Sequence, residues 1–186
     1  MVLDKLKHHL QAPYAVQPPT RIYSGRGLTV NHSTRNVFVS HIHEDDAGLG
    51  KFKTLLKSNG MTVRDYSINS DNPNNAHSES YIKSQILAPR IRQCSVVAVY
   101  VSPKTKNSKY VNWEIEYAHK KGKRIVGVWA HGEKGCEPPE ALIKYGDAFA
   151  GWRGNSIVDA INGDNNDWQE PDGSPGSYQA IKRYSC

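Results

Sequence analysis

The 186-residue chain lacks the features that mark several large classes of protein. No apolar run approaches the ~20 residues of a membrane-spanning helix, and residues 1–10 contain no apolar segment of a secretory signal. Only three cysteines are present, an odd number without the spacing of a metal site. We therefore expect reduced thiols, no bound metal and a cytoplasmic setting. The chain also contains no internal repeat.

Charge of neither sign dominates the sequence. The 24 Lys and Arg residues stand against 18 Asp and Glu residues, which gives a net charge of +6. The basic residues are scattered, and the short cluster at 120–124 is typical of a helix C-terminus, where cations favour the helix dipole. We therefore expect neither a nucleic-acid partner nor a membrane partner.

Strands that alternate with helices predict an α/β domain over residues 35–162. Apolar runs predict strands at 36–41, 62–68, 95–101, 124–130 and 148–152. Helical spacing predicts helices at 47–58, 79–92, between 108 and 122, at 139–145 and at 157–161, with Pro89 kinking or dividing the second. Strands that are apolar on both faces indicate a parallel sheet covered on both sides. Residues 1–34 form an N-terminal arm, and residues 163–186 form a loop-rich tail without a predicted role.

The helix between residues 108 and 122 combines an apolar stripe with a carboxylate. Ser108 is a natural N-cap, and Val111, Ile115 and Ala118 recur at helical spacing. Glu114 shares this inward face, whereas Glu116 points to the opposite side. A carboxylate on an apolar stripe is costly unless it has a partner or a function.

Three loops are expected to meet beside Glu114. In parallel α/β sheets, ligands bind beyond the carboxyl ends of the strands, where the strand order reverses. This rule brings together residues 41–46, 69–78 and 102–110. We expect the loop 69–78, which is rich in Asn, Ser and Pro, to be a mobile lid over the same crevice.

Several motifs, in this order and spacing, resemble those of TIR domains. Residues 37–45, Val-Phe-Val-Ser-His-Ile-His-Glu-Asp, resemble their opening strand and loop, and residues 95–102 resemble their third strand. Residues 108–114, Ser-Lys-Tyr-Val-Asn-Trp-Glu, resemble the helix that follows, although Tyr110 replaces the more usual Trp and Val111 the more usual Cys. The similarity spans about residues 35–162 and is greatest to the bacterial TIR-like proteins of Thoeris antiphage defence.

The resemblance implies a flavodoxin-like fold with a five-stranded parallel sheet. It implies an enzyme that cleaves NAD, as substrate and without a cofactor, at the nicotinamide–ribose bond. The product would be a second messenger, often a cyclic ADP-ribose, that a separate effector protein reads. TIR–TIR assembly and a phage-derived trigger are the other implied partners. The catalytic position falls on Glu114, and the candidate NAD-binding residues are Ser40, His41, His43, Asp45, Asn69, Asn75, Ser102, Tyr110 and Trp113.

The chemistry of this bond fits a single carboxylate. Cleavage builds positive charge on the ribose, which a fixed carboxylate stabilises as in glycosidases. Nicotinamide leaves as a neutral group and needs no strong general acid. Aromatic walls would exclude water, and Tyr110, Trp113 and Tyr100 are the candidates.

Other interpretations of the same residues remain open. Glu114 could be held by an ion pair with Arg90, Arg92 or Lys109, and the histidines, serines and acids of the loops could have purely structural roles. The whole domain could be a catalytically silent TIR adaptor or a nucleotide sensor. A phosphoacceptor receiver shares the architecture but needs an Asp after the third strand, where this chain has Ser102.

Overall fold

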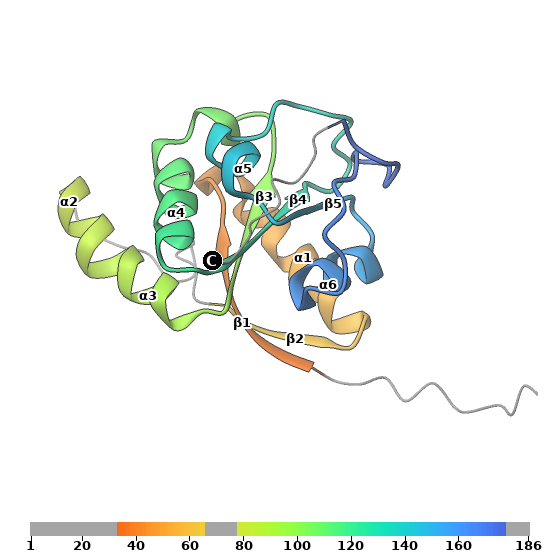
Figure 1. The fold of residues 1–186 in the computed structure, drawn as a ribbon, viewed down its shortest axis with the longest axis horizontal. Coiled ribbons are helices and arrows are strands. Elements are labelled where there is room, and N and C mark those ends of the chain that lie inside the picture. Colours follow the sequence, from red (N-terminus) through yellow and green to blue (C-terminus); the bar gives the residue numbers. More distant parts are fainter. Residues whose placement is uncertain (1–32, 66–77, 178–186) are drawn as a thin grey trace, which may run out of the picture.

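A computed structural model describes residues 33–65 and 78–177, and a single parallel sheet lies at its centre (Figure 1). The strands are β1 (Ser33–Ser40), β2 (Met61–Asp65), β3 (Val96–Val101), β4 (Arg124–Trp129) and β5 (Ala148–Ala150). They lie in the order β2-β1-β3-β4-β5, all parallel. This is the flavodoxin-like order, and it confirms the predicted fold class.

Helices cover both faces of the sheet. One face carries α1 (Asp46–Ser58) and α6 (Gly154–Asn162), and the other carries α3 (Ala88–Gln93), α4 (Lys109–Lys120) and α5 (Glu140–Tyr145) (Figure 1). Short 3₁₀ turns, η1 (His43–Asp45) and η3 (Thr105–Asn107), follow β1 and β3. None of the helices in residues 33–65 and 78–177 is both long and apolar enough to cross a membrane.

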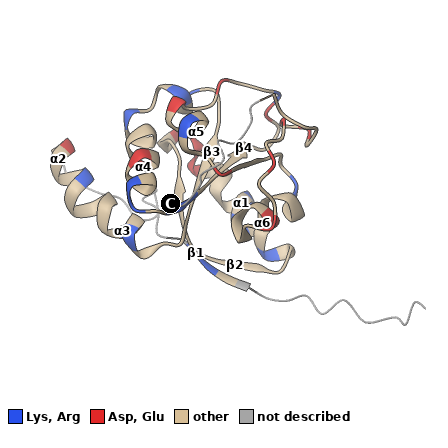
Figure 2. Ribbon diagram, in the orientation of Figure 1, with Lys and Arg blue, Asp and Glu red and all other residues tan. Residues whose placement is uncertain are grey.

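The sheet divides the apolar core into two clusters. Along β3, Val99 and Val101 pack toward α4, whereas Ala98 and Tyr100 pack toward α1 and α6. All six residues of β3 are buried, as expected for a central parallel strand. Figure 2 shows charged positions on the helices and loops, with β3 almost free of them.

Pairing between strands moves several boundaries from their predicted positions. β1 begins at Ser33 rather than residue 36 because Ser33, Thr34 and Arg35 pair with the first residues of β2. Residues 33–35 are polar and lack the apolar pattern from which strands were predicted. They can still pair with β2, because strand pairing uses backbone hydrogen bonds. β5 is shorter than predicted, and α6 is longer, beginning at Gly154 instead of residue 157.

The helix around Pro89 is divided, as its proline predicts. It begins with α2 (Glu79–Tyr81), widens into the π-helical segment η2 (Ile82–Leu87) and continues as α3. Pro89 has no N–H to donate, and its ring clashes with the carbonyl four residues earlier. In the widened turn, the N–H of Ala88 donates to the carbonyl of Lys83, five residues back. The π segment thus accommodates the proline and separates α2 from α3.

Some expectations fall on residues outside those described. These are the arm up to residue 32, the end of the tail from residue 178, and most of the predicted lid. Asn69 and Asn75 belong to this last group.

Candidate active site

Glu114 is the buried charged residue at the centre of the site. It lies on the inward face of α4 between Val111, Ile115 and Ala118, each 0% exposed, and is itself 6% exposed. The helix starts at Ser108, whose Oγ accepts the N–H of Val111. The predicted inward direction of Glu114 is therefore confirmed, and Glu116 is exposed, as predicted.

The partner of Glu114 is a hydroxyl rather than a cation. Ser40, at the end of β1, donates its Oγ–H to Oε2 of Glu114 over 2.5 Å, and it is 1% exposed. Burial raises the pKa of Glu114 to about 8, while the hydrogen bond from Ser40 acts in the opposite direction. Among the described residues, no cation contributes to this shift, so the alternative of an ion pair with Arg90, Arg92 or Lys109 is not supported.

A cavity of about 390 Å³ opens beside this carboxyl. It lies between the loop after β1, the helix α2–η2 and the start of α4. Its lining combines one apolar wall with polar groups on the other sides: His41, Ile42, His43, Glu44, Ile82, Leu87, Ser108, Tyr110 and Glu114. The volume lies within the range of about 300–1,000 Å³ that is typical of ligand pockets.

His41 is a buried histidine in the lining of the cavity. Its side chain is 4% exposed, and its two ring nitrogens lie 2.9 Å from the carbonyl oxygen of Val39 and 2.8 Å from Oδ1 of Asp46. These two contacts hold the imidazole ring between the end of β1 and the start of α1. His43, by contrast, is 82% exposed and lies 3.2 Å from the other oxygen of Asp46.

Asp45 and Ser102 connect two of the loops. The Oγ–H of Ser102 donates to Oδ2 of Asp45 over 2.7 Å, and Thr105 lies 2.9 Å from the same hydroxyl. Burial raises the pKa of Asp45, and the hydrogen bond from Ser102 opposes this shift. Neither residue lines the cavity, but their bond ties η1 to the loop after β3 at the point where the strand order reverses.

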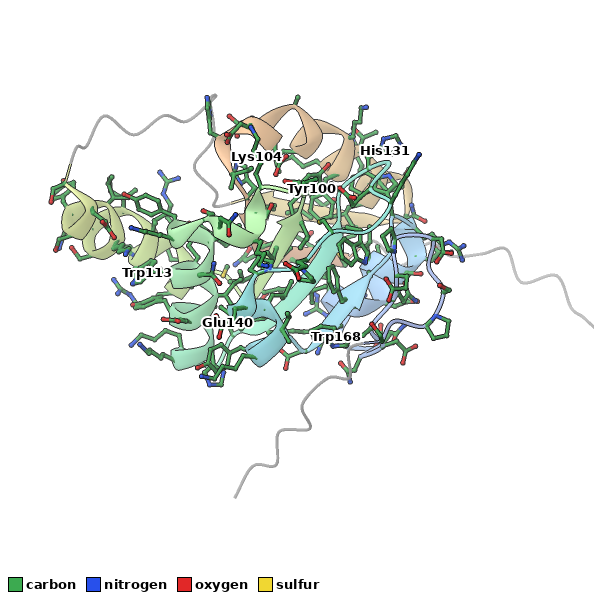
Figure 3. The ribbon with its side chains drawn as sticks, turned by 90° about the horizontal axis from the view of Figure 1, so that it is seen from above. Tyr100, Lys104, Trp113, His131, Glu140 and Trp168 are labelled. Carbon is green, nitrogen blue, oxygen red and sulfur yellow. The ribbon has the colours of Figure 1, made fainter. Side chains whose placement is uncertain are left out.

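The three candidate aromatic walls lie in three different places. Tyr110 lines the cavity. Trp113, one turn later on α4, faces the neighbouring helix α2–α3 and lines a second groove (Figure 3). Tyr100 packs edge-on against Phe52 and Trp152 on the opposite face of the sheet, so the expectation that it walls the cavity is wrong. Strand alternation is the cause, because Tyr100 and Val101 point to opposite faces.

Sequence reasoning missed the apolar wall of the cavity. Ile82 and Leu87 belong to the helix predicted at 79–92, to which no role in the site was assigned, and both line the cavity. They share one side of the divided helix because η2 changes the usual helical spacing between them. Ser108, expected only as a cap, lines the cavity as well.

The arrangement suits stabilisation of a positive charge next to a buried carboxylate. In a low-dielectric site, a fixed negative group acts more strongly than it would in water. Within residues 33–65 and 78–177, no group of three or more His, Cys, Asp or Glu residues could hold a metal ion.

Comparisons with known proteins give two similarities. Residues 38–135, more than half of the chain, match the family model described as Thoeris protein ThsB, TIR-like domain. Among solved structures, the CMP N-glycosidase BcmB of Clostridium botulinum is 15% identical, with a TM-score of 0.42. That match covers 69% of this chain and 98% of the other. No curated protein matches the chain.

Proposed function

The chain belongs to the family of the Thoeris protein ThsB, TIR-like domain, and from this we propose that it cleaves NAD at the nicotinamide–ribose bond. The observation that supports the proposal most directly is the buried carboxyl of Glu114, bonded to Ser40 and facing a cavity. NAD is the substrate, and the reaction requires no cofactor. The proposed setting is the cytoplasm.

The bond that breaks joins C1′ of the ribose to the ring nitrogen of nicotinamide. Its electron pair leaves with nicotinamide, which departs neutral, and positive charge develops on C1′ and the ring oxygen of the ribose. The carboxylate of Glu114 stabilises this charge. Water that attacks C1′ gives ADP-ribose, whereas a ring nitrogen or hydroxyl of the same molecule gives a cyclic product.

The raised pKa of Glu114 links ionisation to substrate binding. With a pKa of about 8, roughly a tenth of the carboxyl groups are ionised at pH 7 in the empty site. The nicotinamide ring of NAD carries a positive charge, and an opposite charge nearby favours the carboxylate. The substrate therefore promotes the catalytic form of Glu114 when it enters.

The family suggests how such a reaction would act in defence. We expect the product to be a second messenger that a separate effector protein reads. Cyclic ADP-ribose is the leading candidate. Activity would rise through TIR–TIR assembly and a phage-derived trigger.

Free nicotinamide is the readout that tests the proposal. Purified protein is incubated with NAD, alone and with lysate from phage-challenged cells, and the second product is identified by mass spectrometry. We expect nicotinamide together with an ADP-ribose derivative in at least the challenged sample. NAD that stays intact in both samples would overturn the proposal and favour the silent adaptor.

A further inference from the structure

A second, larger groove of about 660 Å³ lies next to the Glu114 cavity. Its lining residues belong to α2, η2, α3 and α4. These helices cover the same face of the sheet (Figure 1). Its lining residues are mostly polar or aromatic: Glu79, Ser80, Lys83, Ser84, Ala88, Arg92, Trp113 and Tyr117. The proposed reaction at Glu114 does not use any of them.

Aromatic rings form the α4 side of this groove. Trp113 and Tyr117, one turn apart, stack with their ring centroids 5.1 Å apart and an angle of 16° between their planes. The Nη1 of Arg92 donates to the hydroxyl of Tyr117 over 2.9 Å. The pair thus presents a fixed aromatic surface with a guanidinium at its edge, an arrangement that suits a heteroaromatic base.

Cations outnumber carboxylates around the groove. Lys83 and Arg92 line it, the ammonium of Lys121 lies 5.5 Å from the ring centre of Tyr117, and Glu79 is the acidic residue of the lining. Figure 2 shows basic positions between α2 and α3, on α3 and at the adjoining end of α4, and an acidic position on α2. Phosphate oxygens are the groups that such a set of cations attracts.

Lys83 lies at the boundary between the groove and the cavity. Its ammonium is 5.7 Å from the ring centre of Tyr110, which lines the cavity, and 5.7 Å from that of Trp113, which lines the groove. The ammonium is therefore placed to contact a ligand that extends from one space into the other.

We infer that the groove binds the adenosine diphosphate end of the dinucleotide whose nicotinamide riboside end lies beside Glu114. The inference rests on the proposed function. The 390 Å³ cavity is near the small end of ligand pockets, while a dinucleotide is larger than a typical drug. The groove supplies what the remaining half needs: cations for the diphosphate, with Lys83 at the junction, and the Trp113–Tyr117 surface for adenine.

The ion pair of Lys83 with Glu79 allows a test in which two substitutions change ADP binding in opposite directions. These side chains are 2.5 Å apart, and Glu79 is 60% exposed. A phosphate that binds Lys83 competes with the carboxylate of Glu79 for its ammonium and is repelled by the charge of that carboxylate. Loss of Lys83 should therefore weaken the binding of ADP, whereas loss of the charge on Glu79 should strengthen it.

Binding of ADP to the full chain, measured by calorimetry, provides that test. Lys83→Gln should weaken ADP binding by about tenfold or more, since a hydrogen bond to a charged group is lost. Glu79→Gln should tighten it severalfold. Lys51→Gln, on the exposed side of α1 across the sheet, is the matched control and should leave it unchanged. ADP should also compete with NAD in the cleavage assay, and Lys83→Gln should raise KM far more than it lowers kcat.

The outcomes separate this inference from the proposed function. If NAD is cleaved but ADP either does not bind or binds wild type and Lys83→Gln equally, the groove assignment is wrong and the function stands. If NAD stays intact while ADP binds with the two opposite changes, the groove is a nucleotide site and the proposed function fails. Equal effects of Lys83→Gln and Lys51→Gln would also overturn the groove assignment, because they would reflect net charge alone.

Discussion

At the scale of single residues, the environment of Glu114 decides what this carboxyl can do. The apolar residues of α4 disfavour its charge, and the hydroxyl of Ser40 is the group that favours it. A carboxyl balanced in this way responds to a cation that enters the cavity. Glu116, on the opposite side of the same helix, is exposed to solvent and does not line the cavity.

Replacement of Glu114 by Gln should abolish most NAD cleavage. The amide keeps the shape of the side chain but removes the negative charge that faces the developing cation. Loss of one preorganised electrostatic group costs roughly 10²–10³ in rate. Nicotinamide release under activating conditions is the measurement. Glu116→Gln is the control, and it should retain activity and change the free energy of unfolding by no more than about 0.5 kcal/mol. Equal loss in both variants would mean that α4 matters only as a structural element.

The pH dependence of cleavage should follow the ionisation of Glu114. Because the carboxylate is the active form, kcat/KM should rise with pH and level off above about pH 8. Ser40→Ala removes the hydrogen bond that lowers this pKa, so its profile should move to higher pH. The variant should therefore be severalfold slower at pH 7 and recover much of its activity at pH 9. A loss of the same size at every pH would indicate that Ser40 contacts substrate instead.

The same pKa makes stability depend on pH, independently of any activity. Between the ordinary value of 4.5 and the folded value of about 8, the folded state holds a proton that the unfolded state has lost. The free energy of unfolding should therefore fall as pH rises through this range, by up to about 1.4 kcal/mol per pH unit from this group. Urea unfolding at several pH values tests this. Glu114→Gln should equal wild type near pH 4 and exceed it at pH 8, and parallel curves would contradict the burial of the charge.

At the scale of elements, α4 was the most predictable part of the chain. Its cap, its apolar stripe and the direction of Glu114 all follow from spacing along one helix, and the structure bears them out. The helix at 79–93 was less predictable. Its proline predicted that the helix would be disturbed. A propensity pattern does not specify which backbone carbonyls then accept hydrogen bonds from other residues. The apolar wall formed by Ile82 and Leu87 was missed for this reason.

The N-cap of α4 should contribute measurably to stability. Ser108 Oγ accepts the N–H of Val111 over 3.3 Å, satisfying one of the free donors at the start of the helix. Ser108→Ala should lower the free energy of unfolding by about 1 kcal/mol, and Ser108→Asn should restore most of it. Chemical denaturation of the three proteins measures both changes. If Asn gives no recovery, the loss comes from the cavity that Ser108 lines rather than from the cap.

At the scale of the whole molecule, strand order assembles the site. Ser40 and Glu114 are 74 residues apart and meet because β1 lies beside β3, where the order reverses. The sequence allowed the parallel sheet and the set of loops to be predicted. It could not reveal that Ser40 would be the partner of Glu114, or that Tyr100 would turn to the other face, because both depend on strand register. One residue of shift reverses every side chain of a strand.

The described part of the tail supports the far edge of this sheet, although sequence reasoning gave it no role. β5 has only three residues, and its Phe149 exchanges backbone hydrogen bonds with Asp167 and Gln169. Between these two, Trp168 is 6% exposed and packs edge-on against the ring of Phe149, at 5.7 Å between centroids. The Nε1–H of Trp129 also donates to the carbonyl of Gln169 over 2.7 Å. These residues cover an edge that would otherwise be open to other chains.

Removal of the Trp168 side chain should therefore destabilise the whole domain without changing the chemistry. Trp168→Ala should lower the free energy of unfolding by about 3–5 kcal/mol, the usual cost of deleting a large buried ring. Trp168→Phe keeps a ring against Phe149 and should lose much less. Urea unfolding gives the stabilities, and nicotinamide release per folded molecule gives the activity. That activity should be unchanged, because β3 and β4 separate β5 from the β1 end that holds Ser40. A loss below about 1 kcal/mol for Trp168→Ala would show that the tail does not pack on β5 in solution.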